Sequence, residues 1–180
     1  MMEIIRNRLK NKLNIRTEKD FPKEGIEFID IMPMIMNKDI FNEIIDKIKL
    51  EIENKKVDYI ISPEARGFLL GPVLANKLQV GFVPVRKSGK MPTTTVEYKF
   101  MSEKEYGKDE LELPKLIDDS YKGKKFYIVD DIYATGNTVK AIQKAIKTLG
   151  GDVVGQAVIM NIIELNNDKN IFSLLEVNET

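Results

Sequence analysis

Residues 126–140 read Phe-Tyr-Ile-Val-Asp-Asp-Ile-Tyr-Ala-Thr-Gly-Asn-Thr-Val-Lys. The first four of these residues are apolar, which is typical of a buried strand. Two carboxylates, Asp130 and Asp131, stand where we expect that strand to end. A loop of small and hydroxyl-bearing residues follows, and apolar residues then recur at helical spacing up to Leu149. The stretch therefore predicts a strand, a short loop and a helix in immediate succession.

The loop of this stretch consists of Ala134, Thr135, Gly136, Asn137 and Thr138. Backbone N–H groups at the start of a helix are free to bind an anion, and the helix dipole favours negative charge there. The adjacent carboxylates can accept hydrogen bonds from sugar hydroxyls. Together these features predict a pocket for a sugar phosphate. The alternative is an ordinary strand-to-helix connection, but an acidic pair followed by Thr-Gly-x-Thr is more specific than such a connection requires.

The composition excludes several classes of function. Lys plus Arg equals Asp plus Glu at 28 each, so no global positive field draws the chain to nucleic acid. No apolar run is long enough to cross a membrane, and the charged N-terminal residues do not resemble a signal peptide. Because the chain has no Cys, a disulfide framework is impossible, and a cytoplasmic location is the default expectation.

The absence of Cys and His also limits the chemistry. A structural zinc site is not expected, and Cys–His or Ser–His nucleophilic pairs are impossible. A metal would be held by carboxylates, hydroxyls, water and substrate phosphates, which indicates Mg²⁺ rather than a transition metal. We expect no metal site made by the protein alone.

Strand patterns alternate with helical patterns along the chain, which predicts an α/β fold with a parallel, twisted sheet and helices on both faces. We expect a single domain over residues 1–180, with a hood formed by residues 1–35. No element is predicted for residues 164–180. The expected helices span 37–55, 67–78 and 138–149, and the expected strands span 57–62, 80–85, 126–129 and 152–163.

Residues 87–114 do not fit this alternation. They contain alternating residues from Val96 to Phe100, a turn at 105–107 and a second extended piece at 111–113. We expect a two-stranded flap with a charged tip. Long excursions of this kind in a compact domain are more often lids than padding.

Two basic motifs also follow predicted strands. Arg66 lies in a loop that leaves the strand at 57–62, and Arg86, Lys87 and Lys90 follow the strand at 80–85. Alone, each motif would indicate a surface ion pair or a solvated basic cluster. Loops at the carboxyl ends of parallel strands line the ligand crevice, so both motifs are expected beside the sugar phosphate pocket. The planar guanidinium of Arg66 suits pyrophosphate oxygens.

The combined motifs resemble the type I phosphoribosyltransferases and, within them, the adenine phosphoribosyltransferases. The order and approximate spacing agree from about residue 20 to residue 163. The matching motifs are Phe21-Pro22 with Gly25 and Phe28, Asp30-Ile31, Glu64-Ala65-Arg66-Gly67-Phe68 with Gly71, Gly81 to Lys87 with Gly89-Lys90 and Pro92, Glu105-Tyr106-Gly107, and the loop after Asp130-Asp131.

The resemblance implies a glycosyltransferase of purine salvage. Such an enzyme moves the 5-phosphoribosyl group from phosphoribosyl diphosphate to adenine, with Mg²⁺ bound mainly through the substrate, and releases AMP and pyrophosphate. The family usually forms homodimers, so Arg86 and Lys87 could add charge across an interface.

The resemblance also implies roles for individual residues. Residues 134–138 would hold the 5′-phosphate, and the acidic pair would face the ribose hydroxyls. The implied catalytic residues are Arg66, at pyrophosphate, and Glu105, which would assist proton transfer at the base. Phe28 would stack on adenine.

Three departures from the family pattern affect the site. Asn137 stands where a second Gly is common, and we expect the loop to survive because Asn tolerates left-handed backbone angles. The flap is about two residues longer than is common, so Glu103 competes with Glu105 for the flap role. Ile29 stands where Arg is frequent, so a base contact there would come from the backbone.

Two other functions stay open at this point. One keeps the chemistry but uses hypoxanthine, guanine or xanthine, although the Glu-Tyr-Gly flap favours adenine. The other is a regulator that keeps the fold as a nucleotide sensor and binds nucleic acid, which the balanced charge disfavours.

Overall fold

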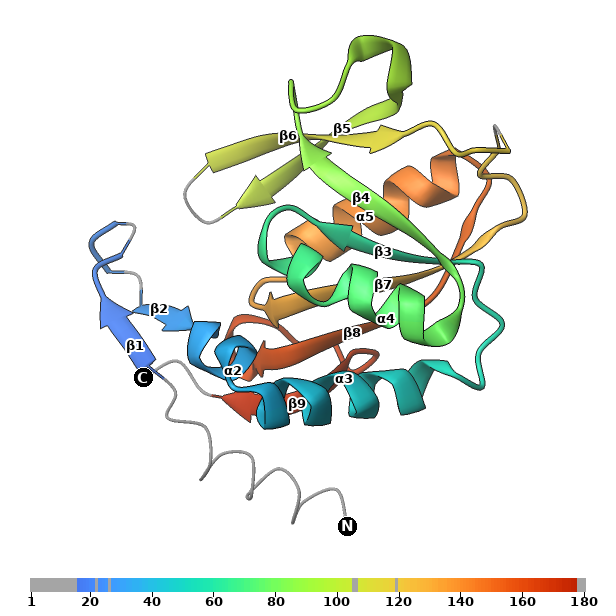
Figure 1. Cartoon of the computed structure of the whole chain (residues 1–180). Helices are drawn as coiled ribbons and strands as arrows, with labels where there is room; N and C mark the ends of the chain where they lie inside the picture. The colour runs from blue at the N-terminus through green and yellow to red at the C-terminus, as the bar shows by residue number, and fades with distance from the viewer. Residues whose placement is uncertain (1–15, 22, 26, 105–106, 119, 178–180) are drawn as a thin grey trace.

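The computed structural model describes residues 16–21, 23–25, 27–104, 107–118 and 120–177. Its elements follow one another along the chain with short connections (Figure 1). They are β1 (Arg16–Lys19), β2 (Glu27–Asp30), α2 (Met32–Met36), α3 (Lys38–Ile52), β3 (Tyr59–Pro63), the 3-10 helix η1 (Arg66–Leu69), α4 (Gly71–Leu78), β4 (Gly81–Lys87), η2 (Thr93–Thr95), β5 (Val96–Lys104), β6 (Gly107–Pro114), β7 (Lys125–Tyr133), α5 (Asn137–Thr148), β8 (Asp152–Ile162), η3 (Ile163–Leu165) and β9 (Phe172–Val177).

The central sheet has seven strands in the order β5-β6-β4-β3-β7-β8-β9. The strands from β4 to β9 in this order pair in parallel, while β6 pairs antiparallel with both β4 and β5. Ile60 and Ile61 are both fully buried and belong to cores on opposite faces, as expected of parallel strands covered on both sides. Helices α3 and α4 cover one face and α5 covers the other, which confirms the predicted fold class.

The helix pattern at 37–55 was predicted well. Asn37 caps α3 by accepting hydrogen bonds from the N–H groups of Asp39 and Ile40. The predicted apolar stripe faces the sheet, with Ile44, Ile45, Ile48 and Ile52 buried. The helical pattern at 67–78 divides into η1 and α4 because Pro72 fits only the first turn of a new helix.

The strand that contains the acidic pair is longer than predicted. β7 continues through Asp130 and Asp131 to Tyr133, so the two carboxylates lie inside the strand and not at its end. The reason is tertiary: β8 extends equally far and pairs with this segment, with Asp130 opposite Val158 and Tyr133 opposite Asn161. Carboxylates are unfavourable in a strand pattern, but the neighbouring strand supplies the hydrogen bonds that keep it extended.

The last strand was not predicted. β9 pairs in parallel with β8 and completes the sheet, and Leu174 and Leu175 enter the core under α3. Phe172 and Val177 bound a short β-prone run, which was the available signal.

The flap pattern corresponds to the hairpin β5–β6, and residues 105–106 at its turn lie outside the described residues. The small antiparallel sheet β1–β2, the end of β5 and the start of β6 lie on the side at which β3, β7 and β8 end (Figure 1). The carboxyl edge of the sheet is therefore bordered by two hairpins.

None of the described helices is long and apolar enough to cross a membrane.

Candidate active site

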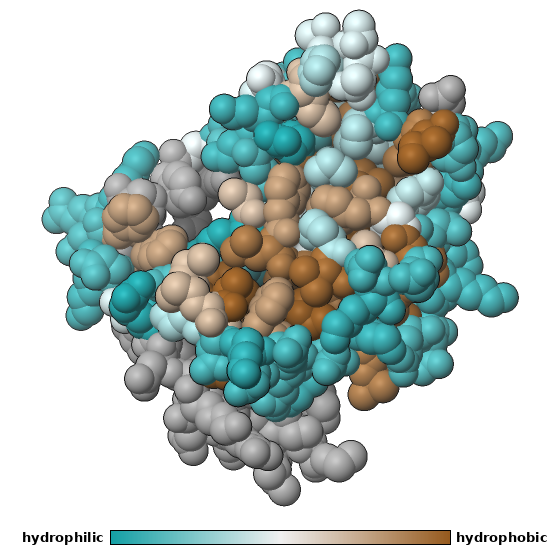
Figure 2. Space-filling model, in the orientation of Figure 1, coloured by the Kyte–Doolittle hydropathy of each residue, from teal (hydrophilic) through white to brown (hydrophobic). Residues whose placement is uncertain are grey.

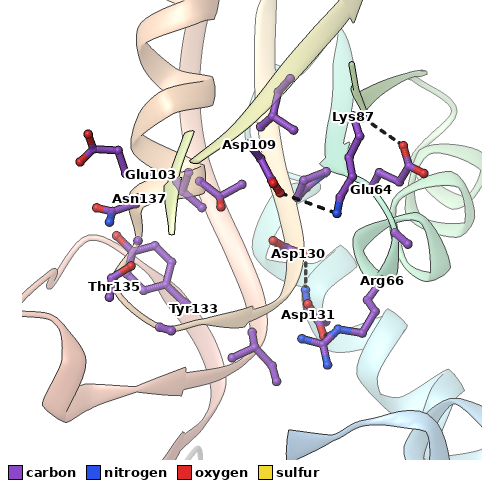
Figure 3. Close-up of a pocket in the computed structure, with 18 of the residues that line it drawn as sticks. Glu64, Arg66, Lys87, Glu103, Asp109, Asp130, Asp131, Tyr133, Thr135 and Asn137 are labelled. Carbon is purple, nitrogen blue, oxygen red and sulfur yellow. Dashed lines mark hydrogen bonds and ion pairs between the residues drawn. The ribbon is translucent and has the colours of Figure 1, made fainter. Parts of the chain in front are cut away.

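A cavity of about 520 Å³ opens at the carboxyl edge of the sheet, between η1, the β5–β6 hairpin and the start of α5 (Figure 3). Its lining includes most of the residues that the sequence singled out. These are Phe28, Arg66, Lys87, Glu103, Asp130, Asp131 and the whole loop from Ala134 to Thr138, joined by Pro63, Glu64, Ala65, Asp109, Leu111, Ile132, Tyr133 and Val139.

The loop from Ala134 to Thr138, called here the 134–138 loop, ends in a helix start that no side chain caps. Gly136 is the N-cap of α5 and has φ 76°, and no side-chain hydrogen bond caps the helix. Lys140 N–H donates to Gly136 O at 2.9 Å, which is the first turn of the helix. The N–H groups that precede Lys140 in the helix lack intrahelical acceptors by geometry. These N–H groups lie at the end of α5 that borders the cavity, where the helix dipole favours an anion such as phosphate.

Gly136 is required at this position for two reasons. Its positive φ disfavours other residues, and a Cβ atom on it would collide with the hydroxyl and ring of Tyr133. Asn137, in contrast, is the first residue of α5, and its backbone is not among those with positive φ. The tolerance of Asn for left-handed angles is therefore not needed at position 137, because the glycine before it makes the turn.

The acidic pair and Arg66 form the charged centre of the cavity. Asp131 is 4% exposed, and its Oδ2 lies 2.7 Å from Arg66 Nε. Asp130 Oδ1 accepts a hydrogen bond of 2.9 Å from Asp131 N–H. Desolvation by the surrounding protein and the charge of Asp131 raise the pKa of the Asp130 carboxyl well above its usual value. The site therefore disfavours ionisation of Asp130 even with Arg66 and the Asp131 N–H nearby, and a further cation would favour it.

Arg66 connects three parts of the site. Besides Asp131, its Nη1 donates to Ile29 O at 3.3 Å, and its guanidinium carbon lies 5.1 Å from the centre of the Phe28 ring. Gly67, the next residue, lets η1 approach β7 closely: a Cβ atom there would lie 3.0 Å from Asp130 Oδ1. In the Arg-Gly pair of the sequence motif, Arg66 thus supplies positive charge to the cavity and Gly67 allows the backbone to approach Asp130 closely.

Glu64 holds the loop after β3 against the end of β4. Its Oε2 accepts hydrogen bonds from Arg86 Nε at 2.9 Å and from Lys87 N–H at 3.0 Å. Desolvation opposes ionisation, but these two hydrogen bonds and the Arg86 charge hold the pKa of Glu64 below its usual value. In the sequence Glu64 stands out only as part of a motif, and its pairing with Arg86 is a tertiary feature.

The basic cluster reaches the cavity only in part. Lys87 lines it, with Nζ 3.7 Å from Asp109 Oδ2 on the hairpin. Arg86 and Lys90, which were expected in the site, are not part of the lining. The Arg86 guanidinium turns toward Glu64 and the Phe68 ring, and Lys90 is exposed on the turn after β4. Alternating strand residues point to opposite faces, so neighbouring basic residues cannot all face one cavity.

The hairpin brings one of the two competing carboxylates to the cavity. Glu103 lines it and lies 3.4 Å from Lys108 Nζ across the hairpin. Glu105 lies outside the described residues. Ser102 of the same strand is buried and donates to Thr138 Oγ1 at 3.4 Å, so the hairpin and the 134–138 loop touch directly.

Three comparisons place this geometry among known proteins. The family model described as "Phosphoribosyl transferase domain" matches residues 35–176. Proteins named adenine phosphoribosyltransferase from Clostridium botulinum and Brachyspira hyodysenteriae are 44% identical over 172 residues and 45% identical over 157 residues. The first alignment covers 93% of this chain and 98% of the relative, and the second covers 87% and 90%.

Solved structures agree. The crystal structure of adenine phosphoribosyltransferase from Thermoanaerobacter pseudethanolicus has a TM-score of 0.84 at 40% identity, covering 98% of this chain and all of the other. That of the Saccharomyces cerevisiae protein has a TM-score of 0.80 at 36% identity, covering 96% and 99%. The resemblance drawn from the sequence is thus confirmed, and the chain belongs to the adenine phosphoribosyltransferase family of phosphoribosyl transferases.

Proposed function

We propose that this cavity carries out the reaction of its family: transfer of the 5-phosphoribosyl group from phosphoribosyl diphosphate to adenine, giving AMP and pyrophosphate. The observation that carries the proposal is the uncapped start of α5 beside two carboxylates and an arginine in one cavity. The Saccharomyces cerevisiae relative was crystallised with adenine and an imino-altritol bisphosphate, so a relative at 36% identity binds both a base and a phosphorylated sugar analogue.

The sugar phosphate end of the substrate would bind along β7 and α5. The N–H groups of the 134–138 loop would donate to the 5′-phosphate, and the hydroxyls of Thr135 and Thr138 would add further donors. Asp130 and Asp131 would accept hydrogen bonds from the ribose hydroxyls. Asp131 is paired with Arg66, so bound substrate would add sugar hydroxyls as partners of this carboxylate.

The pyrophosphate end would lie between η1 and the end of β4. Among the described lining residues, Arg66 and Lys87 carry the positive charge there, and each is paired with a carboxylate. When the bond between the anomeric carbon and pyrophosphate breaks, positive charge grows on the ribose and negative charge on the leaving group. Preorganised cations stabilise the leaving group without reorganising at the moment of reaction. Arg86 would act indirectly, by fixing Glu64.

We also propose Mg²⁺ as the metal, bound mainly through pyrophosphate and ribose oxygens. Among the described residues no three acidic side chains converge as a protein-made metal site. The acidic pair fits a hydrated Mg²⁺ that arrives on the substrate, because ionisation of Asp130 next to Asp131 is unfavourable until positive charge comes near. Such an ion would neutralise charge on the leaving pyrophosphate.

The base would bind between Phe28 and the hairpin. Phe28 lines the cavity and presents a ring on which adenine can stack, and the carbonyl of Ile29 already accepts from Arg66. A carboxylate of the hairpin would take the proton that adenine loses when its nitrogen attacks the anomeric carbon. Glu105 stays our first choice and Glu103 the alternative. Closure of the hairpin would keep water from the activated sugar.

A direct assay tests the proposal. The protein is incubated with labelled phosphoribosyl diphosphate, MgCl₂ and one purine at a time. Labelled AMP with adenine, and no product with hypoxanthine, guanine or xanthine, is the expected result. Product with an oxopurine instead of adenine would show that the enzyme uses a different base. No product with any base would refute an enzymatic role.

The remaining proposals concern organisation. We propose one domain over residues 1–180, with residues 1–35 as a hood and residues 87–114 as a flap, and a cytoplasmic homodimer.

An apolar patch supports the dimer: Figure 2 shows apolar residues gathered over α2 and the start of α4, and Met32 and Met36 of α2 are 38% and 72% exposed. Exposed apolar patches mark protein–protein contacts. Size-exclusion chromatography with light scattering tests the dimer, and Met36→Glu is expected to weaken it.

A further inference from the structure

The end of β7 carries a tyrosine whose ring supports the 134–138 loop from inside. Tyr133 is 1% exposed, and its ring lies next to Thr135 (Figure 3). A Cβ atom on Gly136 would meet the Tyr133 hydroxyl before any other described atom, so the ring fills the space under the turn. Burial and the nearby Asp168 raise the pKa of the Tyr133 hydroxyl, which therefore remains a proton donor at neutral pH.

Asp168 accepts the hydrogen bond from the Tyr133 hydroxyl. Its Oδ2 accepts hydrogen bonds from the Tyr133 hydroxyl at 2.8 Å and from Gln156 Nε2 at 3.2 Å, and its Oδ1 accepts from Asn170 N–H at 2.8 Å. Gln156 is buried in β8 and also bonds to Gln143 of α5. The connection between β8 and β9 is thus tied to both elements that flank the loop.

The side chain of Asn166 binds the backbone carbonyl at the start of the 134–138 loop. Its Nδ2 lies 2.8 Å from Ala134 O and 2.9 Å from Ile162 O, and its Oδ1 accepts from Asp168 N–H at 3.1 Å. Ala134 is the first residue of the 134–138 loop. One side chain therefore joins the loop, the end of β8 and the aspartate that anchors Tyr133.

We propose that Tyr133, Asp168 and Asn166 are positioning residues that fix the 134–138 loop in the conformation that binds the 5′-phosphate. None of the three needs to touch the substrate to act. Tyr133 sets the depth of the turn at Gly136, and Asn166 sets the direction of the Ala134 carbonyl, so the N–H groups between them keep one orientation. This inference rests on the proposed function, because it assigns a support to the same phosphate site.

A pair of identical substitutions on one strand tests the role of Tyr133. Tyr127 also lies on β7, is 1% exposed and donates to Gln156 O at 3.3 Å, but it is not part of the cavity lining. Tyr133→Phe is expected to raise the KM for phosphoribosyl diphosphate about three- to ten-fold, the effect of one lost buried hydrogen bond. Tyr127→Phe should leave that KM unchanged, and neither variant should change the KM for adenine.

Binding measurements separate a positioning role from a general loss of structure. Isothermal titration with ribose 5-phosphate should show the same weakening for Tyr133→Phe, while pyrophosphate should bind as to the unaltered protein. Asn166→Ala should repeat this split, and it keeps the test decisive if Tyr133→Phe does not fold. Asp168→Asn should retain most of the affinity, because its amide oxygen still accepts from Tyr133.

The outcomes distinguish the inference from the function on which it rests. If the unaltered protein makes no AMP and binds no ribose 5-phosphate, the proposed function fails. If it does both, and Tyr133→Phe and Asn166→Ala bind ribose 5-phosphate normally, the positioning role is refuted. Equal losses for ribose 5-phosphate and pyrophosphate, or equal losses in Tyr127→Phe and Tyr133→Phe, would also refute it.

Discussion

The 134–138 loop and the β5–β6 hairpin border the same cavity but are held in different ways. The loop lies between a buried strand and a buried helix face, where Val129 and Ile142 are fully buried, and Asn166 bonds to its first carbonyl. Toward the free end of the hairpin, the ion pair between Glu103 and Lys108 joins two largely exposed side chains. Exposed ion pairs contribute little to stability.

The base of the hairpin carries a buried ion pair, and farther along β5 Ser102 donates to Thr138 Oγ1 at 3.4 Å. Glu112 is 1% exposed, and its Oε1 lies 2.8 Å from Lys99 Nζ and 3.2 Å from Gly89 N–H. The hydrogen bond from Lys99 outweighs desolvation and holds the pKa of Glu112 below its usual value. The 134–138 loop is thus held between buried elements, while the hairpin combines a buried ion pair at its base with an exposed ion pair toward its free end. We expect the hairpin to be the part that closes over substrate, because a closing lid needs fewer stabilising contacts than the rest of the fold.

The largest effect should come from filling the space under the loop. Gly136→Ala adds a Cβ atom against Tyr133 and forces a positive φ on alanine, so we expect kcat/KM to fall on the order of 1000-fold through loss of loop N–H donors. The matched control is Gly89→Ala: Gly89 has φ 78°, but a Cβ atom added there would have no neighbouring atom within 4 Å, and the residue lies on the hairpin side. Steady-state kinetics with a thermal unfolding control would measure both. Similar losses would remove the distinction between the two regions.

The next largest effect concerns the hairpin carboxylate. Glu105→Gln should lower kcat about 100-fold, the lower range for a lost general base, with little change in either KM. Glu103→Gln should change kcat less than about two-fold, because it removes only an exposed ion pair with Lys108. Comparing kcat of the two variants measures this. If Glu103→Gln is the damaging substitution, the hairpin register of the family resemblance is shifted by two residues.

A smaller effect is expected on the fixed side of the site. Asp131→Asn should raise the KM for phosphoribosyl diphosphate about ten-fold, because an amide accepts weaker hydrogen bonds than a carboxylate from ribose hydroxyls and from Arg66. The fold should persist, as circular dichroism can verify. An unaltered KM would contradict a ribose role for Asp131.

The smallest change is one of stability. The pKa of Asp130 is raised in the folded protein, so its ionisation costs stability, and this cost grows as pH rises from the ordinary carboxyl pKa through the raised one. Asp130→Asn should therefore have a higher Tm than the unaltered protein at pH 7, and the difference should shrink toward pH 4. Calorimetric scans at both pH values measure it. A difference that is constant with pH would show that Asp130 is not strained as an anion.

Much of the fold was predictable from local patterns. Helical spacing at 37–55 and 138–149 and the apolar runs at 57–62 and 80–85 correspond to α3, α5, β3 and β4 within a few residues. The candidate site was predictable where chemistry is written in consecutive residues, as in the 134–138 loop and the acidic pair, which the structure brings together in one cavity. The roles of these residues remain predictions.

Other features had no local signal strong enough to predict them. The length of β7 depends on β8, and the strand β9 is stable only because β8 offers an edge to pair with. Arg86 and Lys87 are adjacent in sequence, yet only Lys87 reaches the cavity, because adjacent strand residues point to opposite sides. Glu103 and Glu105 have the same side chain and similar spacing, so sequence could not choose between them.

Local sequence specified which segments are strands, helices and an anion-binding turn, because hydrophobic period, glycine and the acidic pair act over a few neighbouring residues. Packing in three dimensions specified which charges face each other and what supports the turn. Arg66 with Asp131, Glu64 with Arg86, and Asn166 with Ala134 are each separated by more than twenty residues. Such pairs form when packing of the sheet brings strand ends together, and no local pattern specifies a contact between segments so far apart.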